Sequence, residues 1–316
     1  FFQRRDPKSV WAWLLILYFV PIIGFILYFL VGQDMHKSRI FKIKEMEEEI
    51  NFTIRKQEES IRKRELENRN PFLKQYKDLI FYNLESAGAV LTEDNHVEIY
   101  TDGKEKFEAL IKEMKAAKNF IHMQYYIIRN DELFERIREV LVQKAAEGVE
   151  IRILYDSMGC KSMPKRIWRR LSEKGIMTAE FFPALLRRFH LRLNYRNHRK
   201  IVVIDGRTAF VGGFNVGREY LGLSRKFGYW RDTHLKISGS AVTHLQLRFI
   251  QDWNYSAKEN LLRKESYFTT PSDTVYGNSG VQIVSSGPDS AYKNIKNNYL
   301  KLFSEARESI YIQTPY

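Results

Sequence analysis

Apolar and polar positions change their spacing repeatedly along the chain beyond residue 81. Residues 119–128 (NFIHMQYYII) form a short, almost continuous apolar run, and 149–156 (VEIRILYD) form a second, both typical of buried strands. Residues 104–118 and 132–148 are predicted to be helices, the second ending at Gly148. Alternating strands and helices predict an α/β domain whose sheet is covered by helices on both faces.

A long apolar segment lies near the start of the sequence. Residues Trp11–Val31 include no charged side chain, and as one helix they would measure about 31 Å, close to the hydrocarbon thickness of a bilayer. A signal peptide would have a shorter apolar region, and a buried helix of a soluble domain is the third alternative. The pattern favours a transmembrane helix, with the domain that follows it on the cytoplasmic face, since slightly more cations follow the segment than precede it.

Residues 33–70 are strongly charged but carry apolar side chains near helical spacing. This pattern predicts an amphipathic helical linker that ends at the Asn70-Pro71 break. Its apolar stripe could pair with a second copy of the chain or pack on the chain's own catalytic domain. A homo-oligomer is therefore one of two open arrangements.

The strongest chemical signal is the segment Asn197–Tyr220, NHRKIVVIDGRTAFVGGFNVGREY. His198 and Lys200 are two positions apart, so on a strand they would face the same side and Arg199 the other. An imidazole next to an ammonium could attack a phosphodiester and hold its anionic oxygens. A His and a Lys on an apolar strand can also be ordinary edge residues. The further elements of the pattern, Asp205 and the sequence Gly-Gly-Phe-Asn at 212–215, make that alternative less favourable.

Charge adds an anionic partner to this picture. The formal net charge is +13, and the segment 161–200, which leads into the His-Lys pair, carries twelve Lys and Arg residues against two Glu. Such an excess attracts phosphate, phospholipid headgroups or nucleic acid. Cys160 is the only cysteine in the sequence, so no disulfide can form within it. No metal-ligand spacing occurs near the motif, and no cofactor is expected.

The segment 184–193 (ALLRRFHLRL) mixes apolar and cationic residues just before His198. It could be a helix packed on the core, or it could lie in a headgroup layer with its arginines on lipid phosphates. The second alternative is preferred because the motif follows at once. The predicted membrane-interface residues are Arg187, Arg188, Phe189 and Arg192.

An internal repeat relates two parts of the chain. Residues 116–126 (AAKNFIHMQYY) parallel 305–316 (EARESIYIQTPY), with Ala117 aligned to Ala306 and Ile121 to Ile310 at a constant offset of 189 positions. The second copy reaches only its first expected buried strand, and a second His would lie at about position 387 if the spacing held. The expectation is a fragment of a longer protein. Its predicted domains are a membrane segment (1–32), a charged helical linker (33–80), a first repeat (81–265) and a truncated second repeat (266–316).

The His198, Lys200 and Asp205 pattern resembles the signature of the phospholipase D superfamily. Further strings resemble its bacterial cardiolipin synthases over nearly the whole chain, namely YRNHRK at 195–200, IHMQYYII at 121–128, EGVEIRILYD at 147–156, YWRDTHLKISG at 229–239 and SIYIQTPY at 309–316. The resemblance implies a phospholipase D-like mixed sheet flanked by helices. Here the transmembrane helix and the charged helical linker would precede it.

The resemblance also implies the chemistry. One motif's His forms a phosphohistidine intermediate, and the His of a second motif protonates the departing alcohol and activates the incoming one; which role His198 takes is left open. Lys200, Asn215 and the backbone at Gly213 would bind phosphate, and Asp232 would hold the reactive imidazole in its tautomer. Asp205 belongs to the signature, although an Asp-Gly pair is also a common turn.

The implied activity is phosphatidyl transfer between two phosphatidylglycerol molecules, giving cardiolipin and glycerol. Two alternatives are a phosphodiesterase or nuclease of the same superfamily with water as acceptor, and a non-catalytic membrane adaptor. Nucleic acid is not expected as a partner, because the chain lacks the aromatic and basic stacking platform for single strands. The expected partners are an anionic phospholipid and the bilayer.

Overall fold

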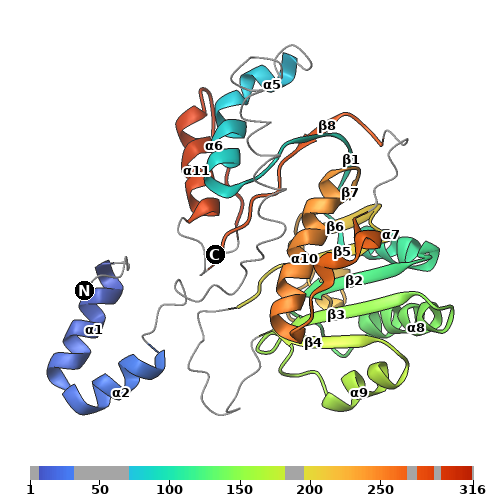
Figure 1. Ribbon diagram of the computed structural model, residues 1–316, viewed down its shortest axis with the longest axis horizontal. Helices are drawn as coiled ribbons and strands as arrows, with labels where there is room; N and C mark the ends of the chain where they lie inside the picture. Colours follow the sequence, from blue (N-terminus) through green and yellow to red (C-terminus); the bar gives the residue numbers. More distant parts are fainter. Residues whose placement is uncertain (1–6, 32–70, 182–195, 269–275, 288–292, 315–316) are drawn as a thin grey trace.

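The central strand of the structure comes from the apolar run at 119–128. In the computed structural model, which describes residues 7–31, 71–181, 196–268, 276–287 and 293–314, this run forms β2 (Phe120–Tyr125) with every side chain buried. The described strands form one sheet in the order β4-β3-β2-β5-β6-β7-β1-β8 (Figure 1). The other strands are β1 (Thr92–Tyr100), β3 (Glu150–Asp156), β4 (Met177–Phe181), β5 (Ile201–Ile204), β6 (Thr208–Gly212), β7 (His234–Ser238) and β8 (Ser279–Val281).

The sheet is mixed, as the resemblance implied. Strands β2, β3 and β4 run parallel, and the connections between them contain α8 (Glu132–Ala146) and α9 (Lys165–Glu173). Strands β5, β6 and β7 are antiparallel neighbours, and β5 also pairs antiparallel with β2. The prediction of an α/β domain is confirmed. Helices α8 and α9 follow the rule that parallel neighbours need a crossover connection, whereas β5 and β6 need only a tight turn.

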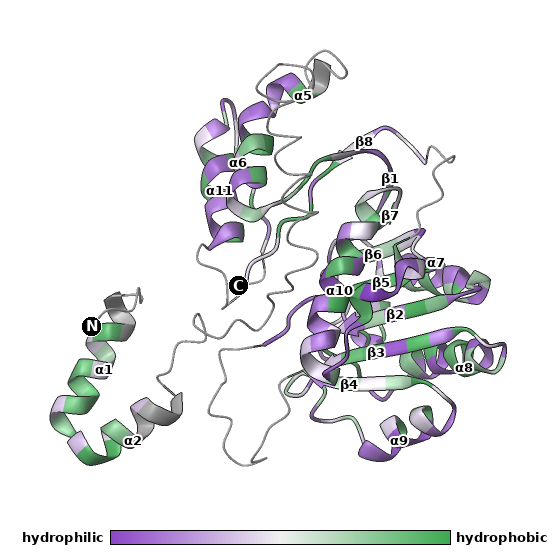
Figure 2. Ribbon diagram, in the orientation of Figure 1, coloured by the Kyte–Doolittle hydropathy of each residue, from purple (hydrophilic) through white to green (hydrophobic). Residues whose placement is uncertain are grey.

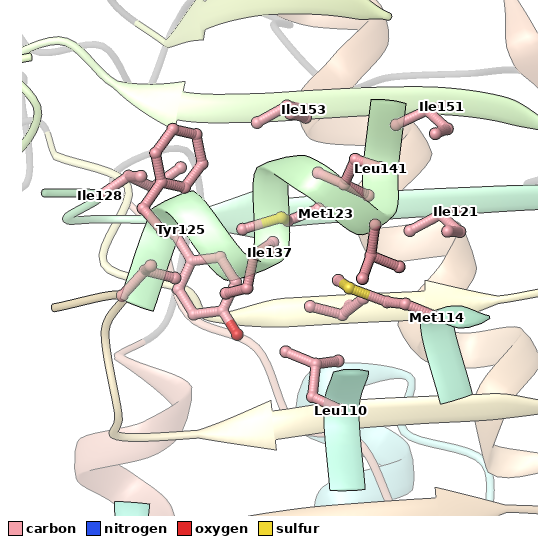
Figure 3. Packing of buried hydrophobic residues seen from close by; sticks show 14 of the residues in the cluster. Leu110, Met114, Ile121, Met123, Tyr125, Ile128, Ile137, Leu141, Ile151 and Ile153 are labelled. Carbon is pink, nitrogen blue, oxygen red and sulfur yellow. The ribbon is translucent and has the colours of Figure 1, made fainter. Parts of the chain in front are cut away.

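Successive side chains of a strand point to opposite faces of the sheet. Both faces therefore carry apolar side chains, and helices cover each of them. Val202 and Ile204 of β5 pack in one apolar core with α7 (Gly103–Ala116), α8 and α9, and Ile201 and Val203 pack in a second core with α10 (Ala241–Ala257). The first core, shown from close by in Figure 3, joins Leu110 and Met114 of α7 to β2 and β3. Even-numbered positions around β5 therefore face α7 and α8, which fixes the side on which Lys200 lies.

A smaller part of the structure lies at the edge of the sheet formed by β1 and β8. Helices α6 (Lys77–Ala87) and α11 (Asn294–Glu305) pack side by side, with α5 (Pro71–Gln75) before α6, and β8 pairs with the long strand β1 (Figure 1). Helix α6 crosses the predicted domain boundary between 80 and 81. Helix α11 occupies the place that the repeat offset assigns to the counterpart of α7.

The prediction of a buried strand at the end of the repeat is wrong. Residues 306–314 form no strand, and Ile310, Tyr311 and Ile312 are exposed. Its counterpart β2 lies between β3 and β5, whose backbones satisfy its polar groups on both sides. No described strand pairs with 306–314, and an extended segment without neighbours cannot form a ladder.

The prediction of a single helix over Trp11–Val31 is also wrong. Two shorter helices, α1 (Pro7–Phe19) and α2 (Pro21–Val31), meet at Val20, and no helix within the described residues is both long and apolar enough to cross a bilayer. Pro21 explains the break, because it has no N–H to donate and its ring clashes with the preceding turn, whereas it is well suited to begin α2. Figure 2 shows both helices as predominantly hydrophobic.

Helices α1 and α2 fold against each other. The rings of Trp13 and Tyr28 meet edge to face with centroids 5.4 Å apart. Gly24 lies against the backbone of Ile16, where a Cβ would approach the carbonyl oxygen to 2.8 Å. Many other apolar side chains of this pair remain exposed, including Trp11, Tyr18, Phe19, Ile22 and Phe25. The predicted linker at 33–70 lies outside the described residues.

Candidate active site

His198 and Lys200 lie side by side immediately before β5. The Lys200 ammonium donates to the His198 carbonyl oxygen at 2.7 Å, and its nitrogen lies 3.0 Å from Nδ1 of the His198 ring. The His198 residue is exposed, whereas Lys200 is buried. Tyr126, which follows β2, flanks both side chains, with its ring centroid 4.5 Å from that of His198 and 5.3 Å from the Lys200 nitrogen. The pair thus shares one face, as the strand period predicted.

Electrostatics favour a neutral imidazole and a readily titrated ammonium at this place. Partial desolvation, followed by the nearby Lys200 charge, lowers the pKa of His198 from its ordinary value. Burial lowers the pKa of Lys200 to about 8, against the opposing pull of Asp232 and Asp156. A neutral imidazole is the form that can act as a nucleophile or a base. The Lys200 charge is only weakly hydrated, so it acts strongly on an anion that comes close.

Two buried carboxylates, Asp156 and Asp252, bind the residues on either side of His198. The Asn197 N–H donates to Asp156 at 3.0 Å, and its side-chain amide donates to Asp252 at 2.8 Å. Arg199, facing the opposite side of the sheet from Lys200, also donates to Asp252 at 2.8 Å. These bonds hold both neighbours of His198, so the imidazole is presented by a rigid segment although the ring itself is exposed.

Asp252 is the site residue that sequence reasoning missed. It is completely buried on α10 and also accepts a hydrogen bond of 2.7 Å from Gln124 of β2. The available signal was its position on the apolar stripe of that helix, seven residues after Leu245 and three after Phe249. A carboxylate at an apolar position must find partners, and here they come from the segment that carries His198.

Gly212, the last residue of β6, and Gly213, which follows it, make room for His234 of β7 and for Asp232 before that strand. A Cβ on Gly212 would lie 2.5 Å from the Cα of His234, and one on Gly213 would lie 1.9 Å from a carboxylate oxygen of Asp232. Asp232 therefore packs directly on the backbone of Gly213 and influences both His198 and Lys200 electrostatically. Its hydrogen bond is with the Thr233 N–H at 2.7 Å rather than with His198.

His234 lies beneath Gly212 as a second, fully buried imidazole. Burial, with smaller contributions from Lys106 and Lys200, lowers its pKa well below the ordinary value. Lys106 of α7 is equally buried and donates to the Tyr125 hydroxyl at 2.8 Å. Burial also lowers the pKa of Lys106 well below its usual range. Burial thus disfavours the charged forms of both His234 and Lys106.

Asn215 lies near the site but uses its amide to join loops. Its oxygen accepts from the Ile127 N–H at 3.1 Å, and its nitrogen donates to the Tyr220 hydroxyl at 2.9 Å. One amide N–H remains after the bond to Tyr220. The phosphate-binding role expected for Asn215 therefore stays a prediction that depends on this remaining donor.

Asp205 lies at the other end of β5, roughly 17 Å from Lys200 and roughly 23 Å from His198 along the strand direction. Its carboxylate accepts from the backbone N–H groups of Lys118, Asn119 and Phe120, each at 2.8 Å. Its φ of 53° and the φ of 66° at Gly206 form the tight turn between β5 and β6. The structure thus separates Asp205 from the His-Lys pair and gives it a structural position.

Replacing Asp205 with Ala is expected to lower the free energy of unfolding by about 2–3 kcal/mol, because three N–H groups lose a charged acceptor. Turnover of the folded fraction should be unchanged. Asp205→Asn is the matched control, since Asn tolerates the left-handed conformation and keeps one acceptor oxygen. Denaturant unfolding followed by tryptophan fluorescence gives the stability. Full stability combined with lost turnover would place Asp205 in the chemistry instead.

The remaining predicted residues, Arg187, Arg188, Phe189 and Arg192, lie outside the described residues. Within the described ranges, no group of three or more His, Cys, Asp or Glu side chains is placed to hold a metal ion. The described side chains offer nucleophilic or acid-base action of the His198 imidazole beside the buried Lys200 cation.

Comparisons with known proteins show which families and sequences the chain is similar to. Residues 110–253 match the family described as "Cardiolipin synthase, PLD-like domain", and residues 1–33 match "Phospholipase_D-nuclease N-terminal". The chain is 46% identical over 319 residues to a cardiolipin synthase of Oceanobacillus iheyensis and 46% identical over 318 residues to the major cardiolipin synthase of Bacillus subtilis. These matches cover 100% of this chain but 65% and 66% of the two relatives, so the chain spans about two thirds of their length.

Among solved structures, phosphatidylserine synthase of Haemophilus influenzae is similar with a TM-score of 0.47 and 16% identity. That similarity covers 74% of this chain and 58% of the other.

Proposed function

Because the chain belongs to the cardiolipin synthase family of phospholipase D-like proteins, we propose that it transfers a phosphatidyl group between two phosphatidylglycerol molecules, giving cardiolipin and glycerol. The observation that carries the proposal is the adjacency of His198 and Lys200, with 3.0 Å between the Lys200 nitrogen and Nδ1. An imidazole that can attack phosphorus and a cation that can hold its oxygens are the two groups this transfer needs first.

In the proposed mechanism Lys200 changes partner when the lipid phosphate arrives. An ammonium that donates to Nδ1 leaves the ring proton on Nε2, whereas attack through Nε2 requires that nitrogen to be unprotonated. The phosphate oxygens compete with Nδ1 for the Lys200 ammonium. Once Nδ1 is released, the ring proton can move from Nε2 to Nδ1, where it is directed toward Asp232, and Nε2 is left unprotonated. Asp232 is supported in this role by its electrostatic influence on both side chains.

The covalent step replaces the bond between phosphorus and the glycerol oxygen with a bond between phosphorus and His198. The Nε2 lone pair forms a bond to phosphorus, and the bond from phosphorus to the glycerol oxygen breaks with its electron pair. A general acid protonates that oxygen, and the same group later takes the proton from the hydroxyl of the second phosphatidylglycerol as its oxygen displaces His198. We assign this acid-base role to the histidine of a second motif, as the family resemblance implies. The Lys200 charge and the remaining Asn215 N–H would stabilise the phosphoryl oxygens throughout.

We also propose that the protein associates with the cell membrane through α1 and α2, with its sheet domain on the cytoplasmic face. The support is the apolar surface of this helix pair, where Trp11 is 67%, Tyr18 79% and Ile22 78% exposed. An exposed apolar surface of this kind marks a contact with another protein or with lipid. The cations Arg4 and Arg5 precede α1 in the sequence and Lys8 is its second residue, and all three suit an anionic headgroup layer.

Membranes that contain the protein, incubated with phosphatidylglycerol labelled in its glycerol headgroup and in its acyl chains, test the proposed reaction. Acyl-labelled cardiolipin and free labelled glycerol are expected in equal amounts. Phosphatidic acid with free glycerol would instead show that water is the acceptor. Absence of turnover, with the protein inserted and folded, would favour the alternative of a non-catalytic membrane adaptor.

The pH dependence of kcat/KM should report Lys200. Because its folded pKa is about 8, the protonated form that binds phosphate disappears as pH rises through this value, and kcat/KM should fall. The acid limb should lie below the ordinary value of His, because the pKa of His198 is lowered. Lys200→Arg keeps a charge at all these pH values and should remove the alkaline limb. An unchanged limb in that variant would assign it to another group.

A further inference from the structure

Beside the site, residues 222–229 form a short hairpin that exposes apolar and cationic side chains together. Ser224 and Gly228 form an isolated antiparallel bridge, with the Gly228 N–H bonded to the Ser224 carbonyl at 2.9 Å. Gly222 and Gly228 have φ values of 72° and 62°, which allow the sharp reversals at its two ends. The turn is therefore preformed, and it holds Arg225, Lys226 and Phe227 at its tip.

The tip exposes more apolar surface than a solvated loop requires. Leu223 is 56%, Phe227 47% and Tyr229 65% exposed, while the intervening Arg225 and Lys226 are also exposed. The Lys226 ammonium lies 5.2 Å from the centre of the Phe227 ring. Single exposed apolar residues are ordinary, but three within seven positions, interleaved with cations, match the composition of a segment that lies in a headgroup layer.

Aromatic packing connects the hairpin to the catalytic residues. Phe227 packs edge to face on Trp230 at 5.3 Å, and Trp230 packs on Tyr220 at 5.7 Å. The Tyr220 hydroxyl accepts from Asn215, and Asp232, which packs on Gly213, follows Trp230 by two residues. Whatever binds the tip is therefore held close to the place where the lipid phosphate must react.

We propose that the 222–229 hairpin docks on a bilayer rich in anionic phospholipid, with Leu223 and Phe227 among the upper acyl chains and with Arg225 and Lys226 on headgroup phosphates. Charge complementarity selects lipid over a second protein surface, because the two cations would be desolvated without partners in an apolar protein contact. The proposal rests on the proposed function in that a membrane lipid is the substrate. It adds a second membrane contact, separate from α1 and α2, that orients the site toward the bilayer.

Depth-dependent quenching tests the contact directly. Phe227→Cys in the full chain, labelled with an environment-sensitive fluorophore and reconstituted into phosphatidylglycerol–phosphatidylcholine vesicles, should be quenched by lipids with a spin label near the headgroup. Ile99→Cys is the matched control, because Ile99 is an exposed apolar residue of β1, at 68%, outside the hairpin. Cys160 is buried, and burial raises the pKa of its thiol to about 12, so it should not react with the label.

Two results would overturn the proposal. A Phe227→Cys label that stays water-exposed in vesicles shows no docking, and a label that is shielded but not quenched by lipid shows that protein covers the tip. The measurement needs no turnover, so failure of the proposed reaction with quenching intact would be recognised as such. Replacing Arg225 and Lys226 with Gln should weaken the contact by about fivefold per charge at low salt, while the Phe227 contact in neutral vesicles should not respond.

Discussion

Replacing His198 with Ala is expected to reduce phosphatidyl transfer by about 10⁴- to 10⁶-fold, the scale at which enzymes lose activity when their nucleophile is removed. The ring is exposed, and its contacts are with Lys200 and Tyr126 rather than with the core. The free energy of unfolding should therefore change by no more than about 0.5 kcal/mol. Transfer is measured with labelled phosphatidylglycerol, and folding by the denaturant midpoint of the same preparation.

His96→Ala is the matched control for this experiment. His96 is exposed on β1 and faces Glu98, so its removal deletes an imidazole of similar exposure outside the site. It should retain ordinary activity. If His198→Ala kept more than about a hundredth of the transfer rate, the loss would be no larger than general acid-base assistance provides, and the nucleophile assignment would be wrong.

Replacing Lys200 with Met should lower kcat by roughly 10²- to 10³-fold, the usual effect of deleting one donor to the reacting oxyanion, about 3 kcal/mol. The free energy of unfolding, in contrast, should not fall. Desolvation already lowers the pKa of Lys200, which means that the fold disfavours its charged form. A Met of similar length fills the same space without that cost, so the variant should unfold at equal or higher denaturant concentration.

Lys236→Met separates loss of this particular cation from loss of charge in general. Lys236 lies on β7 and forms ion pairs with Glu98 at 2.8 Å and Glu113 at 3.1 Å, away from the site. Its replacement should leave kcat unchanged and weaken the fold by about 1 kcal/mol or less. A Lys200→Met variant with ordinary kcat but a raised KM would show that the ammonium only recruits the lipid.

Sequence reasoning predicted those features of the site that depend on local spacing. The two-residue strand period placed His198 and Lys200 on one face and Arg199 on the other, because side-chain direction in a strand depends only on position. The Asp205-Gly206 turn was equally local, since both residues tolerate positive φ. The strand and helix pattern between 97 and 156 predicted the α/β fold for the same reason.

Features that depend on distant contacts were not predicted. Asp252 holds Asn197 from 55 positions away, and Asp205 binds the start of β2 from 85 positions away. Neither partner can be inferred from spacing along the chain. Asn215 was interpreted as a phosphate donor, yet its amide joins Ile127 and Tyr220, a use that becomes visible only once the loops are placed.

At the N-terminus, apolar composition predicts one helix where the backbone forms two. The segment Trp11–Val31 has the length and the lack of charge of a membrane helix, but Pro21 divides it into α1 and α2. A proline in a helix interior removes a hydrogen bond and disfavours the preceding turn, and only packing against neighbours can offset both effects. The 306–314 segment shows the same limit, since a strand sequence forms a strand only beside a partner.

Trapping the covalent intermediate tests the central claim most directly. The protein is mixed with phosphatidylglycerol, quenched in base, where phosphohistidine survives, and digested for mass spectrometry. We predict a phosphatidyl adduct on the peptide that contains His198, absent from His198→Ala and reduced in Lys200→Met. An adduct on another residue, or turnover to cardiolipin without any adduct at His198, would contradict the account.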